Sequence, residues 1–257
     1  MKKSDKQTLN KIRKKINSID KQIIDLLRKR SYLIPKVRTI KNNNLNYKIA
    51  FNREIDIANK ITQSDFGLYD NTFMQKIWRE LISATLKIEC NLNITIYKTK
   101  FTYKDLWETT KDHFGINTNF SFNTNRHKIY ENLLNKSTDM AIMPYFDAKS
   151  FWWIDLCKPQ YKEIKINLIL PYFKEFKTLN NTKSVCISLN NDDIFRYQKL
   201  YILKFNYKIK NLDVNNLKFN IISKYKDCLL IYSNKILPND YFSNDTKLYH
   251  IGSCFIN

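Results

Sequence analysis

The chain has 257 residues, of which 43% are hydrophobic and 26% are charged, and its formal net charge is +20. This length is enough for one large domain or two to three small ones, and the hydrophobic content excludes a disordered chain. Only three glycines are present, Gly67, Gly115 and Gly252. Because P-loops and dinucleotide fingerprints need two or three glycines within a few residues, both kinds of nucleotide site are excluded.

Several other classes of protein are excluded by what the sequence does not contain. No apolar run approaches the ~20 residues that span a bilayer, and the basic start has no apolar run and cleavage site behind it. The five cysteines are widely spaced and never form a CxxC pair, which favours reduced thiols over disulfides or a zinc site. We therefore expect a cytoplasmic protein with no membrane partner, no metal ion and no cofactor.

The positive charge has two interpretations. A basic chain is typical of nucleic-acid binding, but Lys, Asn and Ile are all abundant here, as an AT-rich coding bias would produce. Six of the eight arginines lie in the first 79 residues, so an arginine-built anion site is expected there. We favour coding bias as the source of the charge and do not expect a nucleic-acid partner.

The first 92 residues are predicted to form an all-α domain of three helices. Apolar residues recur at steps of three and four from 8 to 41, which predicts a long helix that Pro35 should kink or locally disrupt. A helix of 30 residues is about 45 Å long, so its apolar face needs a second chain or the other helices to cover it. A second helix is predicted at 52–63 and a third at 71–90, where one face carries Phe73, Ile77, Trp78, Leu81 and Ile88.

Short strands and helices alternate after residue 92. Strands are predicted at 94–97, 119–122, 140–144 and 164–171, and helical segments at 103–114, 128–135 and 152–156. This alternation predicts an α/β domain at 93–178 with a mainly parallel sheet. Strands at 184–189, 217–223, 228–233 and 248–256, with a helix at 192–206, predict an α+β domain of ferredoxin-like character at 183–257.

Polar residues occupy apolar positions on all three N-terminal helices. Arg30 continues the apolar stripe of the first helix, Glu54 lies one turn before Ala58, and Thr85 and Glu89 follow Leu81 at intervals of four. Buried charge is costly unless it is paired or meets a ligand. An ion pair between Arg30 and Glu54 is one interpretation. The excess of cations instead favours a small dianionic ligand; the charged residues are Arg13, Arg30, Lys41 and Arg53 against Glu54 and Glu89.

These residues carry a resemblance to a known family. The runs LNKIRKKINSIDKQIIDLLRKRSYLIPKVRTIK, FNREIDIANKI and FMQKIWRELISATLKIE are similar to the all-helical chorismate mutases over residues 8–90. The resemblance implies an intertwined homodimer that rearranges chorismate to prephenate in phenylalanine and tyrosine biosynthesis. It also implies that no cofactor takes part.

The resemblance assigns a role to each polar position. Arg13 is expected to bind one substrate carboxylate in the active site of the partner subunit, and Arg30 to bind the other carboxylate within its own chain. Lys41 and Glu89 are expected to contact the ether oxygen. Thr85 would line the carboxylate pocket.

Two further residues complete the predicted site, and one position departs from the pattern. Glu54 is expected to accept a hydrogen bond from the ring hydroxyl, and Arg53 to support the charge balance. Family members commonly have Asp where this chain has Ala50, which implies that a contact near the substrate hydroxyl is missing.

The C-terminal two-thirds of the chain resembles known domains weakly. The stretch LWETTKDHFG…TDMAIMPYF is similar to the first lobe of prephenate dehydratase domains, and the last 75 residues are similar to ACT-like regulatory modules. Longer chorismate mutases of alphaproteobacterial type show the same W-R-E-L-x-x-A-T pattern. The Thr-Arg-Phe motif of the dehydratases is absent. The region is therefore interpreted as a degenerate, structural domain, or as one that binds an aromatic amino-acid effector.

Two other functions stay open at this point. An isochorismate pyruvate lyase uses similar cationic helices, although the Arg53–Glu54 pair and the appended domains favour the mutase. A catalytically degenerate protein with a regulatory or nucleic-acid-binding function would show steeply salt-dependent DNA binding and no chorismate turnover.

Overall fold

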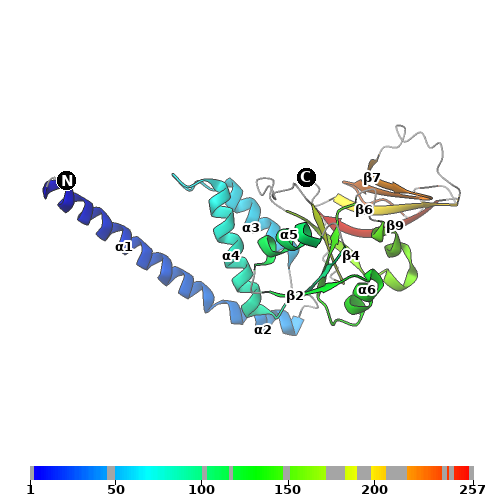
Figure 1. Cartoon of the computed structure of the whole chain (residues 1–257), viewed down its shortest axis with the longest axis horizontal. Coiled ribbons are helices and arrows are strands. Elements are labelled where there is room, and N and C mark those ends of the chain that lie inside the picture. Colours follow the sequence, from blue (N-terminus) through cyan, green and yellow to red (C-terminus); the bar gives the residue numbers. More distant parts are fainter. Residues whose placement is uncertain are drawn as a thin grey trace.

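The computed structural model describes residues 3–44, 50–99, 103–115, 118–146, 151–171, 183–189, 198–206, 219–238, 242 and 246–254, excluding the side chains of residues 3 and 41–44. Helices occupy the N-terminal third, and a mixed sheet with its covering helices follows (Figure 1). The N-terminal helices are α1 (Lys3–Ser31), α2 (Ile34–Asn44), α3 (Phe51–Gln63) and α4 (Asn71–Glu89).

The predicted long first helix is divided into α1 and α2, and the local irregularity predicted at Pro35 is confirmed. Pro35 is the second residue of α2, where a missing backbone N–H costs little. Just before it the chain tightens, because the Leu33 N–H donates to the Arg30 carbonyl at 3.1 Å.

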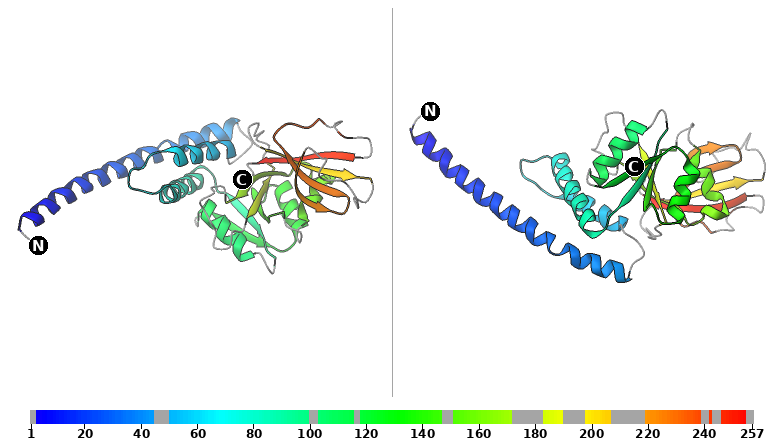
Figure 2. Two further views of the ribbon diagram at one scale, coloured as in Figure 1. Left: turned by 90° about the horizontal axis from the view of Figure 1, so that it is seen from above. Right: turned by 60° about the horizontal axis from the view of Figure 1, so that its bottom comes forward.

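Helix α1 projects away from the rest of the molecule (Figures 1 and 2). Its apolar stripe is exposed along its length, with Ile12, Ile16, Ile19 and Ile23 each about half accessible to solvent. Such an exposed stripe is typical of a helix that packs against another chain.

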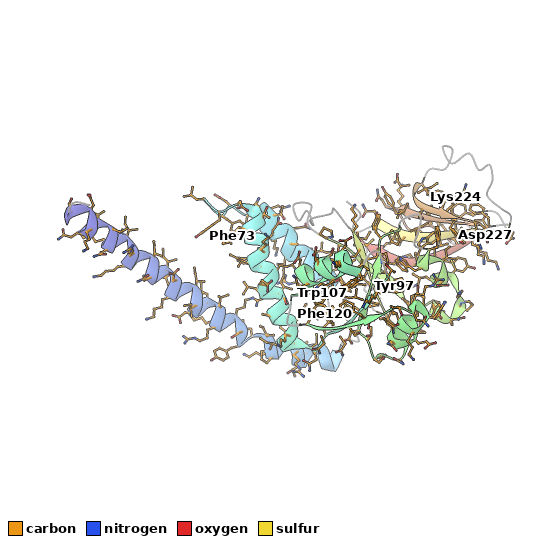
Figure 3. The ribbon with its side chains drawn as sticks, viewed as in Figure 1. Phe73, Tyr97, Trp107, Phe120, Lys224 and Asp227 are labelled. Atoms are coloured by element: carbon orange, nitrogen blue, oxygen red, sulfur yellow. The ribbon has the colours of Figure 1, made fainter. Side chains whose placement is uncertain are left out.

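The apolar face of the third helix differs from the face that is buried in the single chain. Phe73, Ile77 and Ile88 are exposed, and Figure 3 shows Phe73 on the side of α4 that faces away from the sheet. The buried residues of α4 are Gln75, Arg79, Ile82, Ser83 and Leu86. Three of these five are polar, so hydrophobicity alone could not identify this face.

In the described residues after α4, nine strands form one sheet in the order β2-β1-β3-β5-β4-β9-β6-β8-β7. Its strands are β1 (Asn93–Tyr97), β2 (Asn119–Asn123), β3 (Met140–Pro144), β4 (Lys165–Leu170), β5 (Ser184–Ser188), β6 (Gln198–Phe205), β7 (Asn220–Tyr225), β8 (Cys228–Ser233) and β9 (Thr246–Cys254). Strands β2, β1 and β3 are parallel, whereas β5 is antiparallel to both β3 and β4. Two short 3-10 helices, η1 (Trp152–Cys157) and η2 (Pro159–Tyr161), precede β4.

Helices cover both faces of the first half of the sheet. In β3, Met140 and Ile142 belong to a core that includes α5 (Tyr103–Phe114), whereas Ala141 and Met143 face a core that includes α6 (Arg126–Leu134). Successive residues of a strand point to opposite faces, which explains this alternation. On the rim of the α5 layer, Trp107 packs edge-on against Phe120 with ring centroids 5.0 Å apart (Figure 3).

The N-terminal helices share the α5 core. Phe51 and Ile55 of α3 and Leu86 of α4 belong to the same buried cluster as Ile94 and Leu168 of the sheet. The helical segment therefore packs directly onto the sheet.

The second half of the sheet departs from the expected ferredoxin-like domain. A helix was predicted at 192–206, but Gln198–Phe205 forms the buried strand β6, so the prediction is wrong there. Residues 190–197 lie outside the described part of the chain. Among the described residues from 183 onward, none is helical. Strand β5 comes after the domain boundary predicted at 178–183. It nevertheless pairs with β3 and β4, which come before that boundary, so the sheet continues across it.

The two halves of the sheet meet where β4 lies parallel to β9, at the pair Ile166 and Gly252. A Cβ at Gly252 would lie 2.1 Å from the Ile166 carbonyl oxygen. A glycine is required there because the two backbones approach so closely.

Candidate functional site

A cavity of about 370 Å³ lies among the four N-terminal helices. Its lining combines apolar and charged side chains: Arg30, Leu33, Ile34, Val37, Ala50, Arg53, Glu54, Ile57, Ile82, Thr85, Leu86 and Glu89. Five of the seven predicted site residues are among them. The positions that interrupt the apolar pattern in three distant segments therefore meet at one cavity.

Arg30 reaches across the cavity wall to the opposite helix. Its Nη1 donates to Thr85 Oγ1 at 2.7 Å, and this hydroxyl donates in turn to the Leu81 carbonyl at 2.7 Å. The hydrogen bond fixes one arm of an exposed guanidinium whose remaining N–H groups can donate to an anion.

Glu54 lines the cavity and is buried. Its Oε2 accepts a hydrogen bond from Arg79 Nη2 at 3.2 Å and lies 3.6 Å from His113 Nε2. The suggested ion pair with Arg30 is thus replaced by one with Arg79, an arginine to which the sequence analysis gave no role.

Arg79 is held mainly by the end of helix α5. Its Nε donates to the His113 carbonyl oxygen at 2.6 Å, and its Nη2 lies 3.3 Å from His113 Nε2. Burial lowers the pKa of Arg79, while the carboxylates of Glu54 and Glu80 oppose that effect. The guanidinium stays protonated, because arginine does not lose its proton in proteins.

His113 is neutral at physiological pH. Burial, followed by the positive charge of Arg79, lowers its pKa to about 4, and Glu54 opposes both effects. The imidazole therefore contributes hydrogen-bonding atoms to the site but no charge.

Two polar residues of α4 join the helices to the carboxyl end of α5. Ser83 Oγ donates to the Phe114 carbonyl at 2.6 Å, and Arg79 donates to the preceding carbonyl, that of His113. Helix α5 ends at Gly115, whose φ of +76° is the left-handed conformation that favours glycine. A Cβ there would lie 2.0 Å from Ser83 Oγ, so the predicted C-cap is also a point of close packing.

Arg13 and Lys41 are not placed in this cavity. Arg13 is exposed on the projecting helix α1, and the side chain of Lys41 lies outside the described part of the chain. Ala50 lines the cavity as the N-cap of α3 without a side-chain cap hydrogen bond.

Arg79 and Ser83 were not predicted as site residues, and His113 was considered only as a pocket or core residue of the C-terminal region. Gln75, Arg79 and Ser83 are spaced by four residues, which places them on one helical face, so the same search for polar residues on a buried face could have found them. Nothing in the sequence connects that face to His113 in another element.

The described residues contain no group of three or more His, Cys, Asp or Glu side chains that could hold a metal ion. None of the helices described is both long enough and apolar enough to cross a membrane.

Comparison with known proteins identifies the helical segment. Residues 12–90 match the family model described as chorismate mutase type II. Over 143 residues, the chain is 27% identical to a bifunctional chorismate mutase/prephenate dehydratase of Aquifex aeolicus, and the match covers 54% of this chain. The chain spans only 39% of that relative's length.

Solved structures of prephenate dehydratases resemble this chain distantly. The enzyme of Streptococcus mutans matches with a TM-score of 0.39 and 10% identity, over 64% of this chain and all of the other. The enzyme of Staphylococcus aureus matches with a TM-score of 0.37 and 8% identity, over 63% of this chain and all of the other. The family match at residues 12–90 includes every residue that lines the cavity, so the cavity lies in a segment that is similar to the type II chorismate mutases.

Proposed function

We propose that the chain is a chorismate mutase that converts chorismate to prephenate. The observation that carries the proposal is the cavity in which Arg30, Arg53, Glu54, Thr85 and Glu89 meet. The family match over residues 12–90 and the bifunctional relative support the same activity.

The reaction is a unimolecular rearrangement, so the protein has to position the substrate and stabilise charge. Arg30, held by Thr85, binds one carboxylate of the substrate through its free N–H groups. Glu54 accepts a hydrogen bond from the ring hydroxyl. Lys41 stabilises the negative charge that develops on the breaking ether oxygen, and Glu89 donates to this oxygen when its carboxyl group is protonated. Arg53 supports the charge balance.

The second substrate carboxylate needs a cation from another chain. Arg13 lies on the projecting α1, whose exposed isoleucines require a cover. We propose a homodimer in which α1 packs along the partner and Arg13 enters the partner's cavity. The exposed Phe73, Ile77 and Ile88 of α4 offer further apolar surface for the same contact.

The sheet region has a structural role in this proposal, with binding of an aromatic amino-acid effector as the alternative. We place the enzyme in the cytoplasm, where the pathway to phenylalanine and tyrosine operates. The alternative predicts that added phenylalanine or tyrosine changes the mutase rate.

A chorismate-depletion assay across pH, with identification of the product, tests the proposed function. We expect prephenate as the product. Release of pyruvate from isochorismate would identify a lyase instead. Absence of chorismate turnover, together with steeply salt-dependent DNA binding, would support the degenerate regulatory protein.

A further inference from the structure

The carboxyl end of α5 contacts Arg79 and the cavity-lining Glu54, although α5 belongs to the sheet region. His113 lies on its last turn and touches Arg79 with both its ring and its backbone carbonyl. Arg79 in turn contacts Glu54. A continuous series of contacts therefore links the sheet region to a cavity-lining carboxylate.

Of the two neutral tautomers of His113, the one with its proton on Nδ1 fits the shorter contact. The Arg79 guanidinium can only donate, and its Nη2 lies 3.3 Å from His113 Nε2, so Nε2 accepts there. A proton on Nε2 would instead face Glu54 Oε2 at 3.6 Å, beyond hydrogen-bond range, and would leave an N–H of Arg79 opposite a second N–H. Arg79 Nη2 has two hydrogens, so one can bond to His113 Nε2 while the other bonds to Glu54 Oε2 at 3.2 Å.

Burial gives this arrangement its rigidity. Arg79 and His113 are 5% and 6% exposed, respectively, so water cannot replace a lost hydrogen bond at low cost. Two of the donors of Arg79 are directed at His113, which fixes the orientation of the guanidinium plane. The direction of its contact with Glu54 follows from that orientation.

We propose that His113 is a positioning residue of the mutase site: it orients Arg79, and Arg79 holds the Glu54 carboxylate toward the substrate. This inference rests on the proposed function. The sheet region then contributes His113 to the positioning of a residue in the mutase site.

The kinetic test compares two replacements of His113 in the full-length chain. His113→Phe keeps a ring but removes the acceptor, whereas His113→Gln keeps an acceptor near the Nε2 position. We expect His113→Phe to lower kcat/KM by about tenfold, mainly through kcat, and His113→Gln to stay within about threefold of the original chain. His127→Phe is the matched control, because His127 stacks on Tyr161 outside the cavity, and we expect unchanged kinetics.

A double-mutant cycle distinguishes positioning of Glu54 from a general loss of structure. In a Glu54→Ala background, we expect His113→Phe to cost less than about twofold in kcat/KM, since the carboxylate that it positions is gone. An equal cost in both backgrounds, or unchanged kinetics for His113→Phe alone, overturns the proposal.

A spectroscopic readout separates this inference from the proposed function. Nitrogen-15 NMR of the full-length chain at pH 7 should show His113 as the neutral tautomer protonated on Nδ1. The Nε2-protonated or charged form overturns the arrangement, whatever the activity. If the chain leaves chorismate unchanged, the proposed function and the positioning role of His113 in catalysis both fail. In that case the tautomer of His113 still shows whether its ring accepts a hydrogen bond from Arg79.

Discussion

Arg30, on the last turn of α1, donates a 2.7 Å hydrogen bond to Thr85, one turn before the end of α4. This bond spans the cavity wall and leaves the other N–H groups of the guanidinium for an anion. Because one guanidinium bonds Thr85 and an anion at the same time, binding of the anion depends on the planar, forked shape of the arginine group as well as on its charge.

Arg30→Lys should therefore lower kcat/KM by at least about a hundredfold, because lysine cannot bond Thr85 and a carboxylate with one planar group. Arg28→Lys is the control: Arg28 lies on the same turn but pairs with Asp25 at 2.9 Å, and neither of the two lines the cavity. Steady-state kinetics of chorismate depletion measure both. Equal activity in the two variants would contradict the role of Arg30.

The proposed sharing of sites between subunits predicts complementation. Arg13→Ala and Arg30→Ala chains should each be inactive alone. When they are refolded together in equal amounts, half of the dimers are mixed, and each mixed dimer has one intact site. About a quarter of the original activity should return in the mixture. No recovery would mean that each site is built from a single chain.

Glu89 should make the mutase rate depend on pH. A protonated carboxyl group can donate to the ether oxygen, whereas an ionised one repels the developing charge. Glu89→Gln donates at any pH, so its profile of kcat/KM should be flatter on the alkaline side. Glu131→Gln, on the surface helix α6 where Glu131 pairs with Lys128, should leave the profile unchanged. If Glu89→Gln also leaves the profile unchanged, Glu89 does not contact that oxygen.

His113 should make the folded protein sensitive to acid. Its pKa is about 4 in the folded chain, against an ordinary value of 6.5. The unfolded chain therefore binds more protons between these values, and the free energy of unfolding falls as the pH drops from 6.5 toward 4. The loss amounts to about 3 kcal/mol at most.

Urea unfolding between pH 4 and 7 checks the effect of acid. His113→Gln removes the titrating group, so its stability should fall less over this range than that of the original chain. Parallel pH dependences would show that another group dominates.

Ala50→Asp should stabilise the protein. Ala50 is the N-cap of α3 and provides no side-chain hydrogen bond, whereas aspartate there accepts from a backbone N–H of the first turn. The gain in unfolding free energy should be about 1 kcal/mol, measurable by urea denaturation. The original chain, in which Ala50 lacks a cap oxygen, is the comparison, and equal stabilities of the two chains would exclude the cap.

The part of the site that could be predicted from the sequence was the part arranged along single helices. Arg30, Glu54 and Thr85 each interrupt an apolar pattern, and helical periodicity alone places them on inward faces. The contact between Glu54 and Arg79 depends on how α3 and α4 are packed. The contact with His113 also depends on the end of α5, 34 residues beyond Arg79.

The strands of the sheet also could be predicted from the sequence only in part. Most strands of the first half were predicted within a residue or two, because each lies between clear turns. Gln198–Phe205 was mistaken for part of a helix, since buried residues on both faces of a central strand leave no period of two to detect. The apolar face of α4 does not identify the buried face of that helix, because residues such as Phe73 and Ile77 are exposed in the single chain.

The position of β9 has a consequence for the order of assembly. Of the described strands it comes last along the chain but sixth in the sheet, between β4 and β6. Strands β7 and β8 are consecutive and antiparallel, and β6 pairs with β8, so these three can associate early, whereas the described strand that joins them to β4 is Thr246–Cys254. Such long-range pairing slows folding. During synthesis, then, the two halves of the sheet stay separate blocks until this strand has left the ribosome and joins them.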